Sequence, residues 1–116
     1  MSQVQIYHNP RCSKSRETLA LLEQHGVQAD VVLYLTTPPS ADTLATILQK
    51  LNFTSARQLM RTKETLYKEL GLAEVENEDE LIAAMIANPK LIERPIVIKG
   101  DKAALGRPPE QVLDIL

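Results

Sequence analysis

The sequence contains little cysteine and few aromatic residues. Its 116 residues include one cysteine, Cys12, and no tryptophan, and aromatic residues make up 3% of the chain. A single cysteine excludes an internal disulfide and a cysteine-rich zinc site, and it is typical of a reducing compartment. The scarcity of aromatic rings leaves little for stacking on nucleic-acid bases or for an aromatic cage around a cation.

The chain also lacks long apolar runs and an excess of positive charge. No run approaches the roughly 18 apolar residues of a transmembrane helix, and the opening residues, MSQVQIYHNP, lack the apolar core of a signal peptide. A net charge of -2 argues against a general nucleic-acid binder, which needs a basic surface. We therefore expect a cytoplasmic protein with neither a membrane nor a nucleic acid as partner.

The expected elements begin in the order strand, loop, helix, strand. Residues 4–7 are β-prone, and apolar positions at helical spacing predict a helix from about Ser13 that stops at Gly26. Residues 30–35, DVVLYL, are a continuous run of apolar and β-branched residues, which is typical of a buried strand. A second strand that is reached through a helix should lie parallel to the first.

The middle of the chain, about residues 40–88, is expected to be all helical. Ser55 and Gln58 fit a capping box, so SARQLMR should begin a short helix that carries both Arg57 and Arg61. Two other helices are expected in this segment. TTPPS at residues 36–40 caps the first, and Asn77 with Glu80 begins the second, over residues 78–87.

The last part of the chain predicts a β-hairpin and a closing helix. Strand-like segments at 95–99 and 102–105 flank Gly100-Asp101, a pair that suits a primed turn, and Pro108-Pro109-Glu110 opens a helix. The whole order, βαβ, helical insertion, ββα, is the minimal layout of a thioredoxin-like α/β fold with a small mixed sheet. We expect one domain over residues 1–116, with the helical insertion at about 40–88.

Cys12 lies in the loop between the first strand and the first helix. Unpaired N–H groups and the dipole at a helix N-terminus favour a thiolate and can also cradle a tetrahedral oxyanion. Arg11, Lys14 and Arg16 lie close by, and Ser15 stands where a Cys-x-x-Cys motif would have its second thiol, so a resolving thiol must come from another molecule. A reactive thiolate and a small buried apolar residue both stay open as interpretations.

Other residues near these motifs also have two interpretations. His8, at the end of the first strand, would be a general base or a group that orders the loop, or it would make an ordinary structural hydrogen bond. Pro95 suits a cis peptide bond that would expose the backbone of Arg94 beside the loop. On sequence evidence alone, four arginines would be ordinary surface charges: Arg57, Arg61, Arg94 and Arg107.

Taken together and in order, six segments of the chain resemble the ArsC family of glutaredoxin-coupled arsenate reductases and its shorter YfgD-type members. They are HNPRCSKSRETL, LYLTTPPS, RQLMR, LYKELGL, ERPIVI and GRPPEQVLDIL. The resemblance spans nearly the full length of the chain, and it implies a thioredoxin-like fold with a helical insertion.

The resemblance also implies a reaction. Cys12 would attack arsenate to give a thiolate–arsenate adduct, and glutathione would then form a mixed disulfide during reduction to arsenite. Glutathione would be a co-substrate, glutaredoxin a partner, and no cofactor or metal would be bound. By motif, the oxyanion would be bound by Arg61, Arg94 and Arg107, and the Cys12 loop would be supported by His8, Ser15 and Pro95.

Two other functions stay open. A glutathione-dependent thiol oxidoreductase would use Cys12 on another oxyanion or on a protein mixed disulfide. A regulatory binding protein similar to Spx, which contacts RNA polymerase, commonly uses a Cys-x-x-Cys switch. Because Ser15 replaces the second cysteine of that motif, the regulatory interpretation is the less favoured one.

Overall fold

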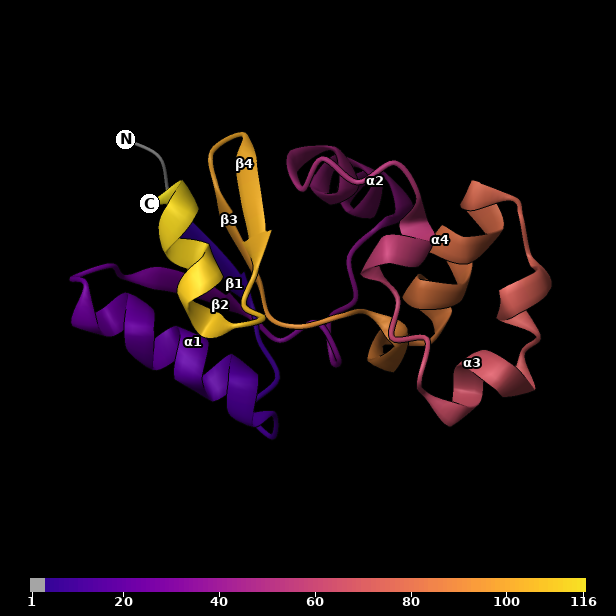
Figure 1. Ribbon diagram of the computed structural model, residues 1–116, viewed down its shortest axis with the longest axis horizontal. Helices are drawn as coiled ribbons and strands as arrows, with labels where there is room; N and C mark the ends of the chain where they lie inside the picture. Colours follow the sequence, from indigo (N-terminus) through magenta and orange to yellow (C-terminus); the bar gives the residue numbers. More distant parts are fainter. Residues whose placement is uncertain (1–3) are drawn as a thin grey trace. The chain divides into compact units, whose positions relative to one another are not determined.

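The computed structural model describes residues 4–116, and contacts within the chain divide it into two compact units (Figure 1). We call the part up to Thr37 together with residues 94–116 the sheet unit, and residues 38–93 the insertion unit. That the two behave as one domain stays a prediction. Within residues 4–116, no helix has both the length and the apolar character needed to span a bilayer.

A mixed four-stranded sheet, in the order β2-β1-β3-β4, forms the centre of the sheet unit. Its strands are β1 (Val4–Tyr7), β2 (Ala29–Val32), β3 (Ile96–Lys99) and β4 (Lys102–Leu105). β1 and β2 are parallel because helix α1 (Ser13–Gln24) returns the chain between them, whereas β3 runs antiparallel to both β1 and β4. The predicted thioredoxin-like α/β fold is confirmed, including the hairpin turn at Gly100, whose φ is 61°.

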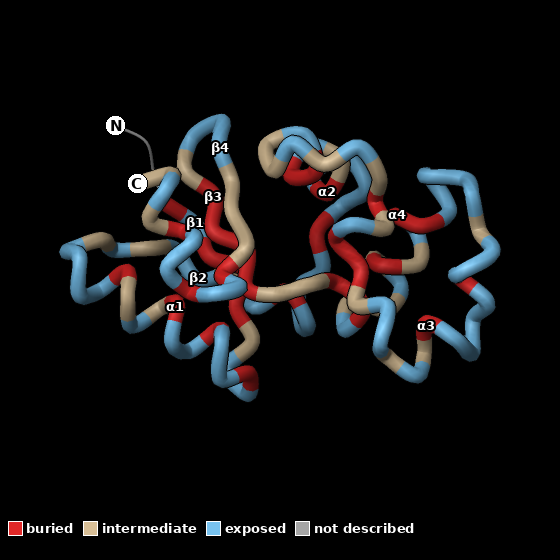
Figure 2. Tube along the Cα trace, viewed as in Figure 1, coloured by how far each residue is buried: buried red, intermediate tan, exposed pale blue. Residues whose placement is uncertain are grey.

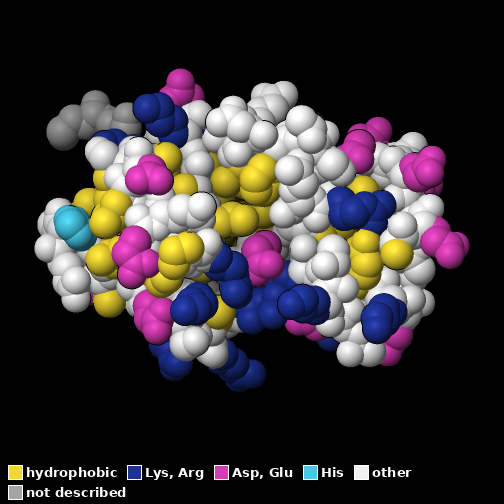
Figure 3. Space-filling view, in the orientation of Figure 1, with side chains coloured by type: hydrophobic (Ala, Val, Ile, Leu, Met, Phe, Trp, Pro, Cys, Tyr) yellow, Lys and Arg dark blue, Asp and Glu magenta, His cyan; other side chains and the backbone are white. Residues whose placement is uncertain are grey.

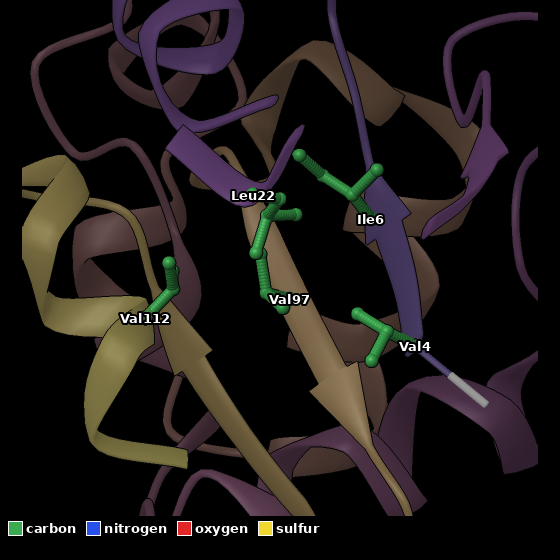
Figure 4. Packing of buried hydrophobic residues seen from close by; sticks show 5 residues of the cluster. All are labelled: Val4, Ile6, Leu22, Val97 and Val112. Atoms are coloured by element: carbon green, nitrogen blue, oxygen red, sulfur yellow. The ribbon is translucent and has the colours of Figure 1, made fainter. Parts of the chain in front are cut away.

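Five buried aliphatic side chains join the sheet to its two helices (Figure 4). They are Val4 and Ile6 from β1, Val97 from β3, Leu22 from α1 and Val112 from the C-terminal helix η4 (Pro109–Ile115). Each such side chain contributes about 1.5–3 kcal/mol when fully buried. The closing helix was predicted, and its geometry is 3-10. This core fixes α1 on the sheet and with it the position of the residues at its N-terminus.

The prediction of a buried strand over residues 30–35 was wrong. β2 ends at Val32 and is an edge strand with a single neighbour, and Val31, Leu33 and Leu35 are all exposed. A continuous apolar run does not distinguish a central strand from an edge strand followed by a turn. In this run only Tyr34 is buried, at 1% exposure.

The insertion unit is built from short helices with the capping residues that the sequence predicted. The side chain of Ser40 accepts the N–H of Thr43, and that of Asn77 accepts the N–H of Glu80. The helices are α2 (Ala41–Lys50), η1 (Ala56–Leu59), α3 (Thr65–Glu69), η2 (Leu72–Glu74), α4 (Glu78–Ala87) and η3 (Pro89–Leu91). Figure 2 shows buried stretches on α2 and α4 in this unit and on β1 and β3 in the sheet unit.

The segment SARQLMR forms a shorter helix than predicted. Ser55 and Gln58 do make the expected capping box, but η1 is a 3-10 helix that ends at Leu59 and carries Arg57 only. Met60 is extended and forms an isolated antiparallel bridge with Ile92. Tertiary pairing therefore overrides the local helical pattern, and Arg61 lies beyond the helix.

Candidate active site

Cys12 is the N-cap residue of α1, with extended backbone angles (φ −96°, ψ 124°). Its N–H donates to the carbonyl of Asn9 at 3.0 Å, and its own carbonyl accepts the N–H of Arg16 at 3.0 Å. The Asn9 side chain also accepts the N–H of Arg11 at 3.0 Å. These bonds close the Asn-Pro turn and direct the chain into the helix at Cys12.

Two kinds of group stabilise the thiolate form of Cys12, whose side chain is buried. Burial by itself raises the pKa of the thiol, but the backbone N–H of Ser15, the guanidinium of Arg94 and the backbone N–H of Lys14 lower that pKa by more. The net result is a lowered pKa for Cys12, which increases the thiolate fraction at neutral pH. The two sequence interpretations are thus compatible, because Cys12 is buried and also activated.

His8 and Ser15 hold the Cys12 loop against the first turn of α1. His8 Nδ1 and Ser15 Oγ are 2.6 Å apart, and the N–H of Asn9 donates to the same Ser15 oxygen at 3.0 Å. His8 also donates its backbone N–H to Val32 of β2 at 2.9 Å. Burial lowers the pKa of His8, which favours the neutral form of its imidazole. His8 thus links the end of β1 to the first turn of α1 through Ser15.

Arg94 precedes β3 and Arg107 follows β4, so the hairpin brings the two arginines together at one end of the sheet. Arg107 Nε donates to the carbonyl of Arg94 at 2.7 Å. The Arg94–Pro95 peptide bond is cis, as the sequence predicted, and Arg107–Pro108 is a second cis bond that was not predicted. The sheet unit thus places two of the three predicted arginines in direct contact, and one of them acts on Cys12.

Gly106 is a site residue that the sequence reasoning missed. Its N–H donates to the carbonyl of Pro95 at 3.0 Å, and a Cβ at this position would lie 2.4 Å from Thr18 Oγ1 and 2.7 Å from Pro95 Cγ. Thr18 is itself fully buried and donates to the carbonyl of Lys14 at 2.8 Å. The only signal was a glycine immediately before Arg-Pro-Pro, where neither a helix end nor a hairpin turn calls for one.

Arg61 belongs to the insertion unit, where two carboxylates hold it. Its guanidinium lies 2.6 Å from Glu64 and 3.8 Å from Glu93, and its backbone N–H donates to Leu91 at 2.7 Å. Sequence reasoning did not identify these acidic partners. A role for Arg61 in oxyanion binding stays a prediction.

Basic side chains also surround the N-terminus of α1 on the outside. Arg11, Lys14 and Arg16 are all exposed, and Figure 3 shows dark blue side chains gathered around this end of the helix. Lys14 makes an ion pair of 3.7 Å with Glu17. Within the part of the chain that the structure describes, no group of three His, Cys, Asp or Glu side chains is arranged to hold a metal ion.

The sheet unit can therefore support nucleophilic attack on an anionic electrophile. It offers a buried thiol with a lowered pKa, helix N-terminal N–H groups and the guanidinium of Arg94. It offers one thiol only, because the sequence has no second cysteine.

Comparison with known proteins agrees with this description. Residues 7–115 match the model of the ArsC family. YfgD of Escherichia coli (strain K12), a protein described as uncharacterized, is 63% identical over 115 residues, which are 98% of this chain and 97% of YfgD. An arsenate reductase of Haemophilus influenzae is 55% identical over 112 residues, 96% of this chain and 97% of that protein. The solved structure of an arsenate reductase from Vibrio cholerae matches with a TM-score of 0.96 at 55% identity, covering 99% of this chain and 98% of that one. The chain therefore belongs to the ArsC family.

Proposed function

We propose that this protein reduces arsenate to arsenite through the Cys12 thiolate, with glutathione and glutaredoxin as electron donors. The observation that carries the proposal is the place of Cys12 at the N-cap of α1, where the Ser15 N–H and the Arg94 guanidinium stabilise its thiolate. The relatives from Haemophilus influenzae and Vibrio cholerae that are named arsenate reductases support the choice of substrate.

Electrostatics explain why arginines belong beside this thiol. Arsenate is a dianion near neutral pH, so its approach to a thiolate is repulsive unless fixed cations offset both charges. Arginine stays protonated and donates in a planar fork that matches an oxyanion. In the proposal Arg94 and Arg107 bind the arsenate oxygens, and each charge-assisted hydrogen bond contributes about 1.5–3 kcal/mol.

The reaction uses two thiols and transfers two electrons to arsenic. The Cys12 sulfur attacks As(V), a S–As bond forms, and an arsenate oxygen leaves as water after protonation. A glutathione thiolate then attacks the Cys12 sulfur, so a S–S bond forms and the S–As bond breaks. The electron pair of the broken bond stays on arsenic, which leaves as arsenite. The net change is arsenate plus two thiols to arsenite, one disulfide and water.

The remaining predicted residues have supporting roles in this proposal. His8 and Ser15 keep the loop in the conformation in which the Ser15 N–H faces the Cys12 sulfur. Pro95 directly follows Arg94, whose carbonyl accepts the hydrogen bond from Arg107. By motif, Arg61 is proposed as the third oxyanion ligand; in the insertion unit its guanidinium is paired with Glu64.

Steady-state arsenite formation from arsenate, with glutathione and a purified glutaredoxin, tests the proposal directly. We expect Cys12→Ser to reduce the rate to the uncatalysed background, because the hydroxyl cannot form the disulfide. Circular dichroism of the variant controls for folding. Equal rates for the two proteins would remove Cys12 from the mechanism, and glutathione uptake by Cys12 without arsenite formation would favour a thiol oxidoreductase with another substrate.

A further inference from the structure

The sheet unit exposes three large apolar side chains within a short stretch of chain. Val31 is 45% exposed, Leu33 45% and Leu35 43%. Val31 lies on the edge strand β2, and the two leucines follow in the turn after it. We call these three residues the β2 edge patch. Single exposed apolar residues are ordinary on a protein surface, whereas three large ones within five residues of chain suggest an interaction site.

The turn that carries the two leucines is held in place. Tyr34, between them, is 1% exposed and its ring stacks on that of Tyr7, with centroids 6.5 Å apart. The N–H groups of Thr36 and Thr37 donate to the carbonyl of Leu33 at 3.0 and 2.9 Å. The leucines are therefore exposed by a defined turn, which costs a binding partner little ordering entropy.

The turn with Leu33 and Leu35 and the Cys12 loop follow the same end of two parallel strands. Tyr7 of β1 is paired in parallel register with Val32 of β2, and the next residue, His8, donates its N–H to the carbonyl of Val32 at 2.9 Å. The chain after Tyr7 leads to Cys12, and the chain after Val32 leads to Leu33. The exposed basic residues around the N-terminus of α1 lie along the first of these loops.

A glutaredoxin that acts as the electron donor of the proposed function must reach the glutathione that is bound to Cys12. The sequence holds one cysteine, so the mixed disulfide between Cys12 and glutathione needs a thiol from outside the chain. Because Cys12 is only 8% exposed, a thiol carried by a protein reaches the glutathione on Cys12 only if the surface around that thiol covers the neighbouring loops.

We propose that the β2 edge patch docks a glutaredoxin-class reductase; this inference rests on the electron route of the proposed function. In the proposed complex the β2 edge patch packs against apolar side chains around the thiol of the partner. Arg11 and Arg16 fit carboxylates, either of the partner or of the glutathione that Cys12 carries. In the docked complex the glutaredoxin thiolate attacks the glutathione sulfur, a new S–S bond forms between those two, and Cys12 leaves as its thiolate. The lowered pKa of Cys12 makes it a good leaving group.

The test starts from the Cys12–glutathione mixed disulfide, prepared with oxidised glutathione and confirmed by intact mass. The rate of Cys12 release is measured with a purified bacterial glutaredoxin and, separately, with dithiothreitol. We expect the double variant Leu33→Ser/Leu35→Ser to lower the glutaredoxin rate constant about tenfold and to leave the dithiothreitol rate unchanged. The matched control is Leu70→Ser in the insertion unit, which removes a leucine that is 46% exposed and should change neither rate.

Three results would overturn the docking inference. They are an unchanged glutaredoxin rate in the double variant, an equal loss with dithiothreitol, and no acceleration by glutaredoxin even for the wild-type disulfide. Because the disulfide is prepared chemically, none of these results depends on arsenate. Failure of arsenate reduction itself is detected separately, by the arsenite assay above.

Discussion

Two arginines, Arg57 in the insertion unit and Arg94 in the sheet unit, have opposite roles. In the insertion unit Arg57 donates to the Tyr67 hydroxyl and to the carbonyls of Leu72, at 2.9 Å, and Val75, so its guanidinium ties η1 to η2. In the sheet unit the guanidinium of Arg94 faces the Cys12 sulfur and lowers its pKa. One arginine satisfies backbone carbonyls and the other stabilises a reactive anion.

The partners of the two guanidinium groups distinguish a structural arginine, Arg57, from a candidate functional one, Arg94. Arg57 donates to neutral acceptors in a partly buried site, so its hydrogen bonds contribute to folding stability. Arg94 stabilises the thiolate of Cys12 relative to the neutral thiol, so its effect appears as a lowered pKa of Cys12. The two roles predict opposite mutational signatures, and the substitutions below are designed to separate them.

The largest stability effect is expected for Arg57→Met. The Leu72 carbonyl keeps the N–H of Val75, but the variant leaves the Val75 carbonyl and the Tyr67 hydroxyl without this donor, and each unsatisfied group costs about 1–3 kcal/mol. We expect the free energy of unfolding in urea to fall by about 2–5 kcal/mol. The pH dependence of Cys12 alkylation should stay as in the wild type. A shift in that profile would contradict a purely structural role for Arg57.

The largest effect on reactivity is expected for Arg94→Met. Removing the guanidinium takes away a charge and a hydrogen bond that both lower the pKa of Cys12, so that pKa should rise. Arsenate reduction should slow at least about tenfold, the equivalent of one charge-assisted contact.

Iodoacetamide alkylation as a function of pH measures the Cys12 pKa in this variant. Arg16→Met is the matched control, because it removes a nearby exposed arginine that does not contribute to the pKa shift of Cys12. Identical alkylation profiles for Arg94→Met and the wild type would contradict the assigned role of Arg94.

A smaller loss, about 1–3 kcal/mol of unfolding free energy, is expected for Gly106→Ala. The new Cβ would meet Thr18 Oγ1 and the ring of Pro95, neither of which is the far end of a flexible side chain. Because Pro95 follows Arg94, alkylation of Cys12 should also slow. Gly71→Ala is the control in the insertion unit: its φ of 64° makes alanine strained, but no atom lies within 4 Å, so only stability should change.

The smallest effect is the contribution of the thiolate to stability, which should depend on pH. The folded state lowers the pKa of Cys12, so the thiolate stabilises it fully above the ordinary thiol pKa. As the pH falls from that ordinary value through the folded pKa, the unfolded chain binds its proton first and the stabilisation is lost. The difference in unfolding free energy between wild type and Cys12→Ser should therefore decrease over this window. A difference that is flat with pH would contradict the lowered pKa.

Local sequence rules predicted much of the fold. Capping at Ser40, Ser55 and Asn77 was read correctly because one side chain and the next turn decide it, and the hairpin was read from Gly100-Asp101. The rules failed where neighbours far along the chain decide. β2 is an edge strand because nothing described pairs with its outer side, and Met60 is extended because Ile92 pairs with it.

The candidate site shows the same division. Position relative to a helix N-terminus was enough to single out Cys12, and the motif order suggested Arg94 and Arg107. Glu93, which holds Arg61 together with the nearby Glu64, and Thr18, which Gly106 approaches closely, both lie far along the chain from the residues they contact. No local pattern reports such contacts, so the sequence did not reveal them.

The most direct test of the central claim is arsenate-dependent glutathionylation of Cys12. The wild-type protein is incubated with glutathione, with and without arsenate but without glutaredoxin, and its intact mass is measured after rapid acid quenching. The account predicts one glutathione per chain, on Cys12, formed together with arsenite and only when arsenate is present. Absence of the adduct, or the same amount of it without arsenate, would contradict the account.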